Sequence, residues 1–222
     1  MLILLTVIPS ILILLVIVLN DRFREPTGLV LACFFWGCAL CLPAGFLNSL
    51  FIWSQENADD LAYLAAITEE PLKFMVIYFF VRNRSAFDEP MDALVYGTAI
   101  SLGFATLENF EYVFSAATID QSFEIAVLRA ISAVPMHASC GVIMGYFFGR
   151  YMFSGDRIML LKSLAVPIFF HGVYNLACNY SFGFAVLILI IMFLFCDQLH
   201  REFCREQEKK RVEYEQKHAQ LD

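Results

Sequence analysis

The sequence predicts an all-α fold: a polytopic integral membrane bundle of about seven transmembrane helices, with the N-terminus outside and the C-terminus in the cytoplasm. Composition is the first observation behind this prediction. Of 222 residues, 59% are hydrophobic and 23 are phenylalanine, and the mean hydropathy is +0.66, whereas a soluble domain is nearer half apolar. The other two observations are recurring apolar segments of about 20 residues, the length that crosses a bilayer, and basic residues confined to alternate loops.

The apolar segments give the predicted helices in order. We expect them at residues 2–19, 28–53, 61–81, 91–115, 123–150, 158–179 and 181–197. The first has no basic stretch and no Ala-x-Ala-like cleavage motif, so we interpret it as a spanning helix rather than a signal peptide. The second and fifth are longer than a bilayer requires, and we expect bends at Pro43 and Pro135.

The basic residues predict the orientation. All but Lys73 and Arg129 of the fifteen lysines and arginines lie in or beside three alternate loops or in the segment after residue 200. The positive-inside rule places these on the cytoplasmic side. We therefore expect a transmembrane domain at 1–199 and a charged cytoplasmic tail at 200–222, which we interpret as a solvated helical extension. No basic stripe indicates a nucleic-acid partner, so the bilayer is the expected environment.

The third predicted helix carries ionisable residues inside its apolar run. Glu69, Glu70 and Lys73 all lie there, although a charged side chain at mid-membrane costs about 3 kcal/mol or more. Such groups are expected to face a protein-lined cavity and to carry function. Glu70 and Lys73 are three residues apart, which lets them pair on one face. Pro71 removes a backbone donor, and we expect a break there, with Thr68 capping a new helical start.

Other predicted helices bring polar residues to the same depth. Counted from the cytoplasmic ends, Glu69, Glu70, Glu108, His137 and His171 lie about 11 to 15 residues inward, or roughly 17–23 Å at 1.5 Å per residue. Four separate helices thus supply carboxylates and imidazoles to one layer. Chance placement would scatter these residues, so the sequence predicts a site in the outer half of the membrane.

Further polar residues flank this layer. Asn175 lies four residues after the last histidine and shares its face, and Asn109 directly follows the glutamate of the fourth helix. We interpret Arg129 as the counter-charge of a buried carboxylate or as a side chain that extends outward to the membrane surface. Glu111 and Glu124 lie near the outer helix ends, and we expect both to be solvated.

These residues are compatible with two functional classes. In hydrolysis, a carboxylate would activate water while histidine and asparagine stabilise the oxyanion, or the same side chains would hold Zn²⁺. In transport, the carboxylates and histidines would relay protons or cations. Composition and depth leave both classes open.

Four ordered motifs resemble the PrsW family of intramembrane proteases. They are EExxK at 69–73, FxxxEN at 104–109, Arg129 followed eight residues later by His137, and HxxxN at 171–175. The resemblance extends from residue 8 to about residue 175. The family is related to the CAAX-processing and Abi-type membrane proteases, whose members cleave peptide bonds in or near the membrane.

The resemblance implies a multi-pass protease of the bacterial plasma membrane. Its substrate would be a membrane-anchored protein such as an anti-sigma factor, cut on the extracytoplasmic side in site-1 cleavage. A proton- or cation-coupled transporter is the alternative. Oligomeric state and activating signal are not implied.

The resemblance also assigns roles to residues. The implied catalytic residues are Glu69, Glu70, Glu108, His137, His171 and Asn175, supported by Lys73, Asn109 and Arg129. Glu70 is the first choice for water activation and Glu69 its competitor. The family's usual description as metalloproteases implies Zn²⁺ on Glu70, Glu108, His137 and His171 and no other cofactor. Glutamate-only catalysis is the alternative, since no HExxH motif is present. Asn175 departs from a family pattern that can carry Asp, which favours an orienting role.

Overall fold

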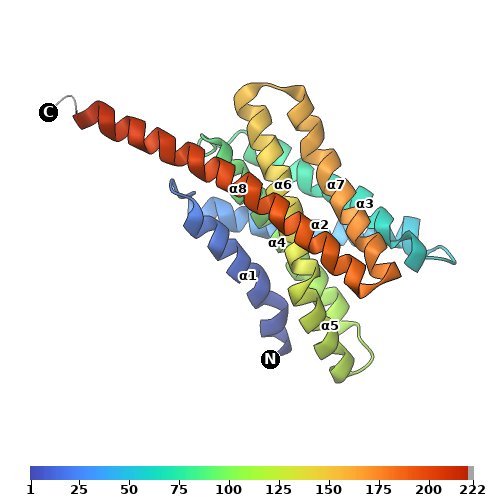
Figure 1. Cartoon of the computed structure of the whole chain (residues 1–222). Coiled ribbons are helices and arrows are strands. Elements are labelled where there is room, and N and C mark those ends of the chain that lie inside the picture. Colours follow the sequence, from blue (N-terminus) through green and yellow to red (C-terminus); the bar gives the residue numbers. More distant parts are fainter. Residues whose placement is uncertain (220–222) are drawn as a thin grey trace.

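The computed structural model describes residues 1–219 and is a bundle of helices, with no strand in that range (Figure 1). This confirms the all-α membrane bundle. The α-helices are α1 (Leu2–Asn20), α2 (Thr27–Asn48), α3 (Ala65–Val76), α4 (Pro90–Phe114), α5 (Ile119–Ile131), α6 (Ala133–Ser154), α7 (Arg157–Tyr180) and α8 (Phe182–Ala219). A wide π-helical turn at Ser49–Trp53 extends α2, and a tight 3₁₀ segment at Asp59–Leu64 leads into α3, which a second π-helical turn extends over Ile77–Val81.

Five helical segments of the described chain are long and apolar enough to cross a membrane. They are Leu2–Asn20, Thr27–Trp53, Ile119–Ser154, Arg157–Tyr180 and Phe182–Val212. The predicted spans at 61–81 and 91–115 are helical but are not among the five. The first contains Glu69, Glu70 and Lys73, and the second is α4, which is enclosed by other helices. The number of seven spans and the orientation stay predictions.

Helix α4 is the centre of the bundle. It packs against α1, α2 and α6, and from Met91 to Thr106 every residue is buried. Glycines allow this approach: a Cβ on Gly103 would lie 1.8 Å from the carbonyl oxygen of Phe34, and one on Gly145 would lie 2.3 Å from that of Ala93. Such close backbone contact is typical of membrane helix pairs.

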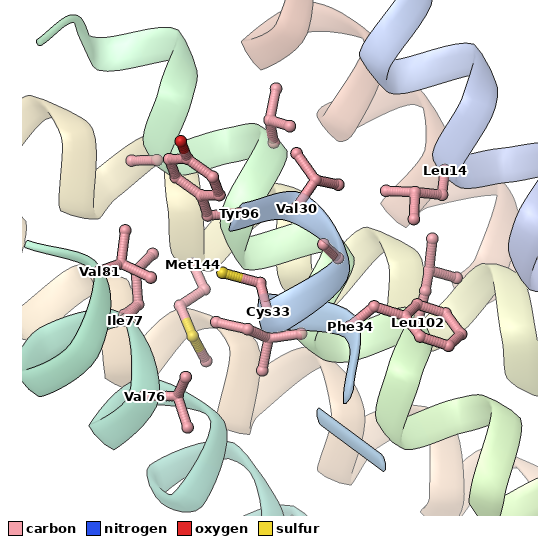
Figure 2. Packing of buried hydrophobic residues seen from close by; sticks show 14 of the residues in the cluster. Leu14, Val30, Cys33, Phe34, Val76, Ile77, Val81, Tyr96, Leu102 and Met144 are labelled. Atoms are coloured by element: carbon pink, nitrogen blue, oxygen red, sulfur yellow. The ribbon is translucent and has the colours of Figure 1, made fainter. Parts of the chain in front are cut away.

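The largest apolar cluster lies where α1, α2, α3, α4 and α6 meet. Figure 2 shows part of it, with Val30 and Cys33 from α2 beside Tyr96 from α4 and Met144 from α6. Because the cluster contains residues of both α3 and α4, its packing fixes the position of the two helices relative to each other.

The two prolines expected to bend helices have different surroundings. The fifth predicted helix is two helices, α5 and α6, which meet at Ser132. Pro135 is the third residue of α6, and since it has no N–H, the carbonyl of Ile131 loses its helical partner and the helix breaks there. Helix α2 continues through Pro43 to Asn48 without interruption, so the bend expected there stays a prediction.

The predicted helical start at Thr68 is wrong. Helix α3 begins at Ala65 and continues through Pro71. The Thr68 hydroxyl donates to the carbonyl of Ala65 at 2.8 Å and to Oδ1 of Asn48 at 2.5 Å, so it caps nothing. The irregular backbone lies one turn earlier, in the tight 3₁₀ segment Asp59–Leu64.

The tail is not solvated on every face. Helix α8 continues without interruption across the predicted boundary at residue 199, and Leu199, Phe203 and Gln207 are buried. Arg150 of α6 pairs with Glu202 and, at 2.8 Å, with Glu206. The first two turns of the predicted tail therefore pack on the bundle, and residues 220–222 lie outside the described range.

Candidate active site

The carboxylates of α3 lie inside the protein. Glu69, Glu70 and Lys73 are 2%, 0% and 0% exposed. The Lys73 ammonium donates to Oε1 of Glu70 at 2.8 Å and lies 3.7 Å from Oε2 of Glu69. The predicted i,i+3 pair is thus present, and one ammonium serves two carboxylates.

Two histidines reach this pair from other helices. Nδ1 of His171 on α7 lies 2.8 Å from Oε1 of Glu70, and Nδ1 of His137 on α6 lies 3.1 Å from Nζ of Lys73. The imidazole rings meet edge to face, with centroids 5.0 Å apart. The common depth counted along the sequence therefore corresponds to direct contact.

Glu108 of α4 completes the group. Its Oε2 lies 2.9 Å from Nε2 of His137 and also accepts a hydrogen bond from Arg129 of α5. Arg129 donates through Nε to Oδ1 of Asn109 at 2.6 Å. Arg129 is thus the counter-charge that the sequence predicts, and its partner is Glu108.

The charges of the group do not balance. Three carboxylates, Glu69, Glu70 and Glu108, face the two cations Lys73 and Arg129. Oε2 of Glu69 and Oε2 of Glu70 are buried and have no hydrogen-bond partner in the described part of the chain. A buried oxygen without a partner is costly, so the site has a place for a proton, a water or a cation.

A cavity of about 730 Å³ opens beside this group. Its walls include Glu69, Glu108, His137 and His171, whereas Glu70 lies behind them and does not line it. The remaining wall includes the aromatic residues Trp53, Phe104, Tyr112 and Tyr174. The volume is in the range of small-molecule sites and admits a short extended peptide.

Asn175 lies on the cavity wall but is engaged elsewhere. Its Nδ2 donates to the backbone carbonyl of Ala62 at 3.2 Å, and Asn179, one turn later, donates to the carbonyl of Asp59 at 2.5 Å. Helix α7 thereby holds the tight turns that lead into α3. No hydrogen bond from Asn175 to a site carboxylate or histidine occurs within residues 1–219.

Asn48 is a site residue that the sequence motifs do not contain. Its Nδ2 donates to Oε1 of Glu69 at 3.1 Å, and its Oδ1 accepts from Thr68 at 2.5 Å. Because an ionised carboxylate can only accept, the amide turns its nitrogen toward Glu69. In the sequence, Asn48 stands out only as an amide near the end of the apolar predicted helix 28–53. No motif connects it with the glutamates of α3.

Two groups of donor atoms could hold a metal in this layer. The first comprises Glu69, His137 and His171, and the second Glu70, Cys140 and His171, each with donor atoms within 4.8 Å of one another. One carboxylate with two imidazoles is a common catalytic zinc set. The set implied by the resemblance contains Glu70 and Glu108, whose contacting oxygens are already bonded to cations and histidines.

Residues 25–197 match the family model described as PrsW family intramembrane metalloprotease. The chain belongs to the PrsW family. Proteins named Protease PrsW are similar to it: that of Geobacillus kaustophilus is 37% identical over 177 residues, covering 76% of each chain. That of Bacillus subtilis is 36% identical over 176 residues, 75% of this chain and 78% of the relative. No solved structure matches the chain.

Membership in the PrsW family makes the chain an intramembrane protease and a multi-pass membrane protein. This decides between the two classes that the sequence left open, because transport is not the activity of the family. The carboxylates and histidines that α3, α4, α6 and α7 bring together are accordingly the candidate residues for peptide hydrolysis.

Proposed function

We propose that this protease resides in the bacterial plasma membrane and cuts a membrane-anchored regulatory protein, such as an anti-sigma factor, on its extracytoplasmic side. The position of the cavity supports cleavage on the extracytoplasmic side. Its walls extend to Trp53, Ser115 and Asn179, which lie at the helix ends joined by loops without lysine or arginine. By the positive-inside rule these ends are extracytoplasmic. A peptide could therefore enter the cavity from outside.

Glu69 is the proposed base that activates the attacking water. The observation that carries this proposal is its buried Oε2, which has no hydrogen-bond partner among the described residues and belongs to a residue of the cavity wall. That oxygen lies 3.9 Å from Nε2 of His171. Sequence reasoning gave Glu70 the first place. The geometry favours Glu69, since Glu70 lies behind the wall and is bonded to Lys73 and His171.

The neighbouring residues would position the reacting groups. Asn48 holds Glu69, and Glu70 fixes the His171 ring through Nδ1, which directs Nε2 toward Glu69. Glu108 and Lys73 together fix the ring of His137. The Arg129 guanidinium and the His137 ring line the cavity and would stabilise the oxyanion of a tetrahedral intermediate.

Zn²⁺ fits the same residues. Glu69, His137 and His171 would hold it, because their donor atoms converge within 4.8 Å and Oε2 of Glu69 has no hydrogen-bond partner among the described residues. With zinc bound, Glu69 would be a ligand, and it would serve as the base only in a metal-free centre. His137 would exchange its contact with Lys73 or Glu108 for the metal. When bound, zinc supplies a Lewis acid that polarises the scissile carbonyl and makes a bound water more acidic.

Reconstitution with a membrane-anchored anti-sigma factor tests the substrate and the side together. We expect cleavage in proteoliposomes within the substrate segment that lies on the side opposite the basic loops, with the cut mapped by mass spectrometry. The His171→Ala variant is the control and should leave the substrate intact. A cut on the side of the basic loops would refute the proposed side. An anti-sigma factor that stays intact while an unrelated membrane protein is cleaved would refute the proposed substrate.

A further inference from the structure

A second group of carboxylates lies at the other end of the bundle, among the basic loops. It comprises Asp21 and Glu25 in the connection between α1 and α2, and Asp92 in the first turn of α4. The three residues are 2%, 8% and 0% exposed, and one oxygen of each lies within 4.8 Å of the others. None of them contacts the active-site cavity.

One oxygen of each aspartate is fixed by donors. Oδ2 of Asp92 accepts from the backbone N–H groups of Asp88 at 2.8 Å and Glu89 at 2.7 Å, which caps α4. Oδ1 of Asp21 accepts from the backbone N–H of Phe23 at 3.2 Å and from Nε2 of Gln207 on α8 at 2.8 Å. The orientations of both carboxylates are therefore set by the fold.

The remaining oxygens have no donor. Oδ2 of Asp21 and Oδ1 of Asp92 are buried and lack a hydrogen-bond partner in the part of the chain that the structure describes. Glu25, whose Oε2 accepts from the hydroxyl of Tyr96, lies beside them. These two buried oxygens, one from each aspartate, therefore lie in a region of concentrated negative charge.

Among the described residues no lysine or arginine forms an ion pair with these carboxylates, and Arg24 favours the charged form of Asp21 only from a greater distance. Across the described side chains, no lysine or arginine lies within 4.0 Å of the three carboxylates; Lys210 instead lies 3.7 Å from Glu89 and Arg22 lies 3.5 Å from Glu208. Burial raises the pKa of Asp21 and of Glu25 above their usual values, because the loss of hydration outweighs the hydrogen bonds that stabilise the charged forms.

We infer that Asp21, Glu25 and Asp92 bind a hard divalent cation of the Mg²⁺, Ca²⁺ and Mn²⁺ class. The donors are carboxylate oxygens alone, which suit these ions rather than the nitrogen- and sulfur-seeking transition metals. Two oxygens bound to Ca²⁺ at about 2.4 Å can be up to about 4.8 Å apart, so the observed spacing admits the ion.

The position of this cation site gives it a structural role. It joins the connection between α1 and α2 to the start of α4, and Gln207 extends it to α8 by donating to both Asp21 and Glu89. A bound cation would remove the repulsion among the three carboxylates. The juxtamembrane ends of α1, α2, α4 and α8 would then be held together, independently of the peptide-cleaving site.

Electron paramagnetic resonance of Mn²⁺ tests the inference on the full chain, purified in detergent and stripped with EDTA. We expect the wild type to bind Mn²⁺ and to release it to Mg²⁺ or Ca²⁺, and the Asp21→Asn/Asp92→Asn variant to bind it more than about tenfold more weakly, since carboxylate charge sets affinity in such sites. Asp88→Asn is the matched control: Asp88 is exposed in the neighbouring loop, and its variant should bind as the wild type does. His171→Ala should also bind, which separates this site from the active site.

A second measurement needs no variant. Mg²⁺ or Ca²⁺ should raise the thermal midpoint of the wild type well beyond the effect of NaCl at equal ionic strength. Equal Mn²⁺ affinity in the wild type and in the double asparagine variant would overturn the inference. So would a wild type that neither binds Mn²⁺ nor responds to Mg²⁺ and Ca²⁺, because the carboxylates would then share protons instead.

Discussion

A Glu69→Gln variant is expected to cleave its substrate about 100- to 10,000-fold more slowly than the wild type, the range that a positioned general base contributes. Glutamine keeps the shape of the side chain and can still accept from Asn48. It can neither take a proton from water at Oε2, which has no hydrogen-bond partner among the described residues, nor bind a metal there as a carboxylate does. Initial rates in proteoliposomes would measure the loss, and thermal unfolding in detergent should show a fold as stable as that of the wild type.

The control for this prediction is Glu124→Gln, an exposed carboxylate of α5 that should be replaceable without effect. Glu70→Gln separates the two adjacent glutamates. Glu70 positions His171, so Glu70→Gln should lower the cleavage rate by about 10- to 100-fold, a smaller loss than that of Glu69→Gln. A larger loss for Glu70→Gln than for Glu69→Gln at equal stability would restore Glu70 as the base.

The second large effect is on stability. Lys73→Met is expected to lower the free energy of unfolding by about 3–5 kcal/mol, because it leaves Glu70, which is wholly buried, without its counter-charge. The Glu70→Gln/Lys73→Met double variant should recover most of the loss, since a buried ion pair contributes little net stability once both charges are removed. Chemical unfolding in detergent would give the free energy of unfolding of the wild type, the single variant and the double variant.

An exposed ion pair provides the comparison for this cycle. Arg201 and Asp197 pair at 2.8 Å on the surface of α8, and Arg201→Met should change stability little. If Lys73→Met unfolds at the same denaturant concentration as the wild type, the ammonium does not compensate Glu70 as described here.

Much of the site could be predicted from the sequence because helices have a fixed rise. Counting along regular helices placed Glu108, His137 and His171 at the level of the α3 carboxylates, and all of them are in contact. Ion pairs of Lys73 and Arg129 with carboxylates could be expected, because a cation enclosed in a membrane protein needs a counter-charge.

What the sequence could not decide depends on packing. Glu69 and Glu70 are neighbours on α3, and the packing of the surrounding helices determines that Glu69 lines the cavity while Glu70 does not. Asn48 reaches Glu69 because α2 packs on α3. The burial of Phe203 similarly requires the position of α8 relative to α6, which no local pattern in the tail contains.

The break between α5 and α6 shows the same limit at a smaller scale. Pro135 correctly indicates an interruption in the predicted helix, but the break lies at Ser132, next to Ile131, whose carbonyl loses its donor because proline has no N–H. Pro43 and Pro71 have the same chemistry, yet α2 and α3 continue through them. Tertiary packing determines which proline ends a helix.

Metal analysis of the purified protein, combined with chelator sensitivity of cleavage, tests most directly whether Glu69, His137 and His171 form a metal-dependent catalytic centre. We predict about one zinc per chain, cleavage that a chelator abolishes and added Zn²⁺ restores, and little zinc in Glu69→Gln and His171→Ala. A metal-free protein that cleaves at full rate in the presence of chelator would contradict this assignment.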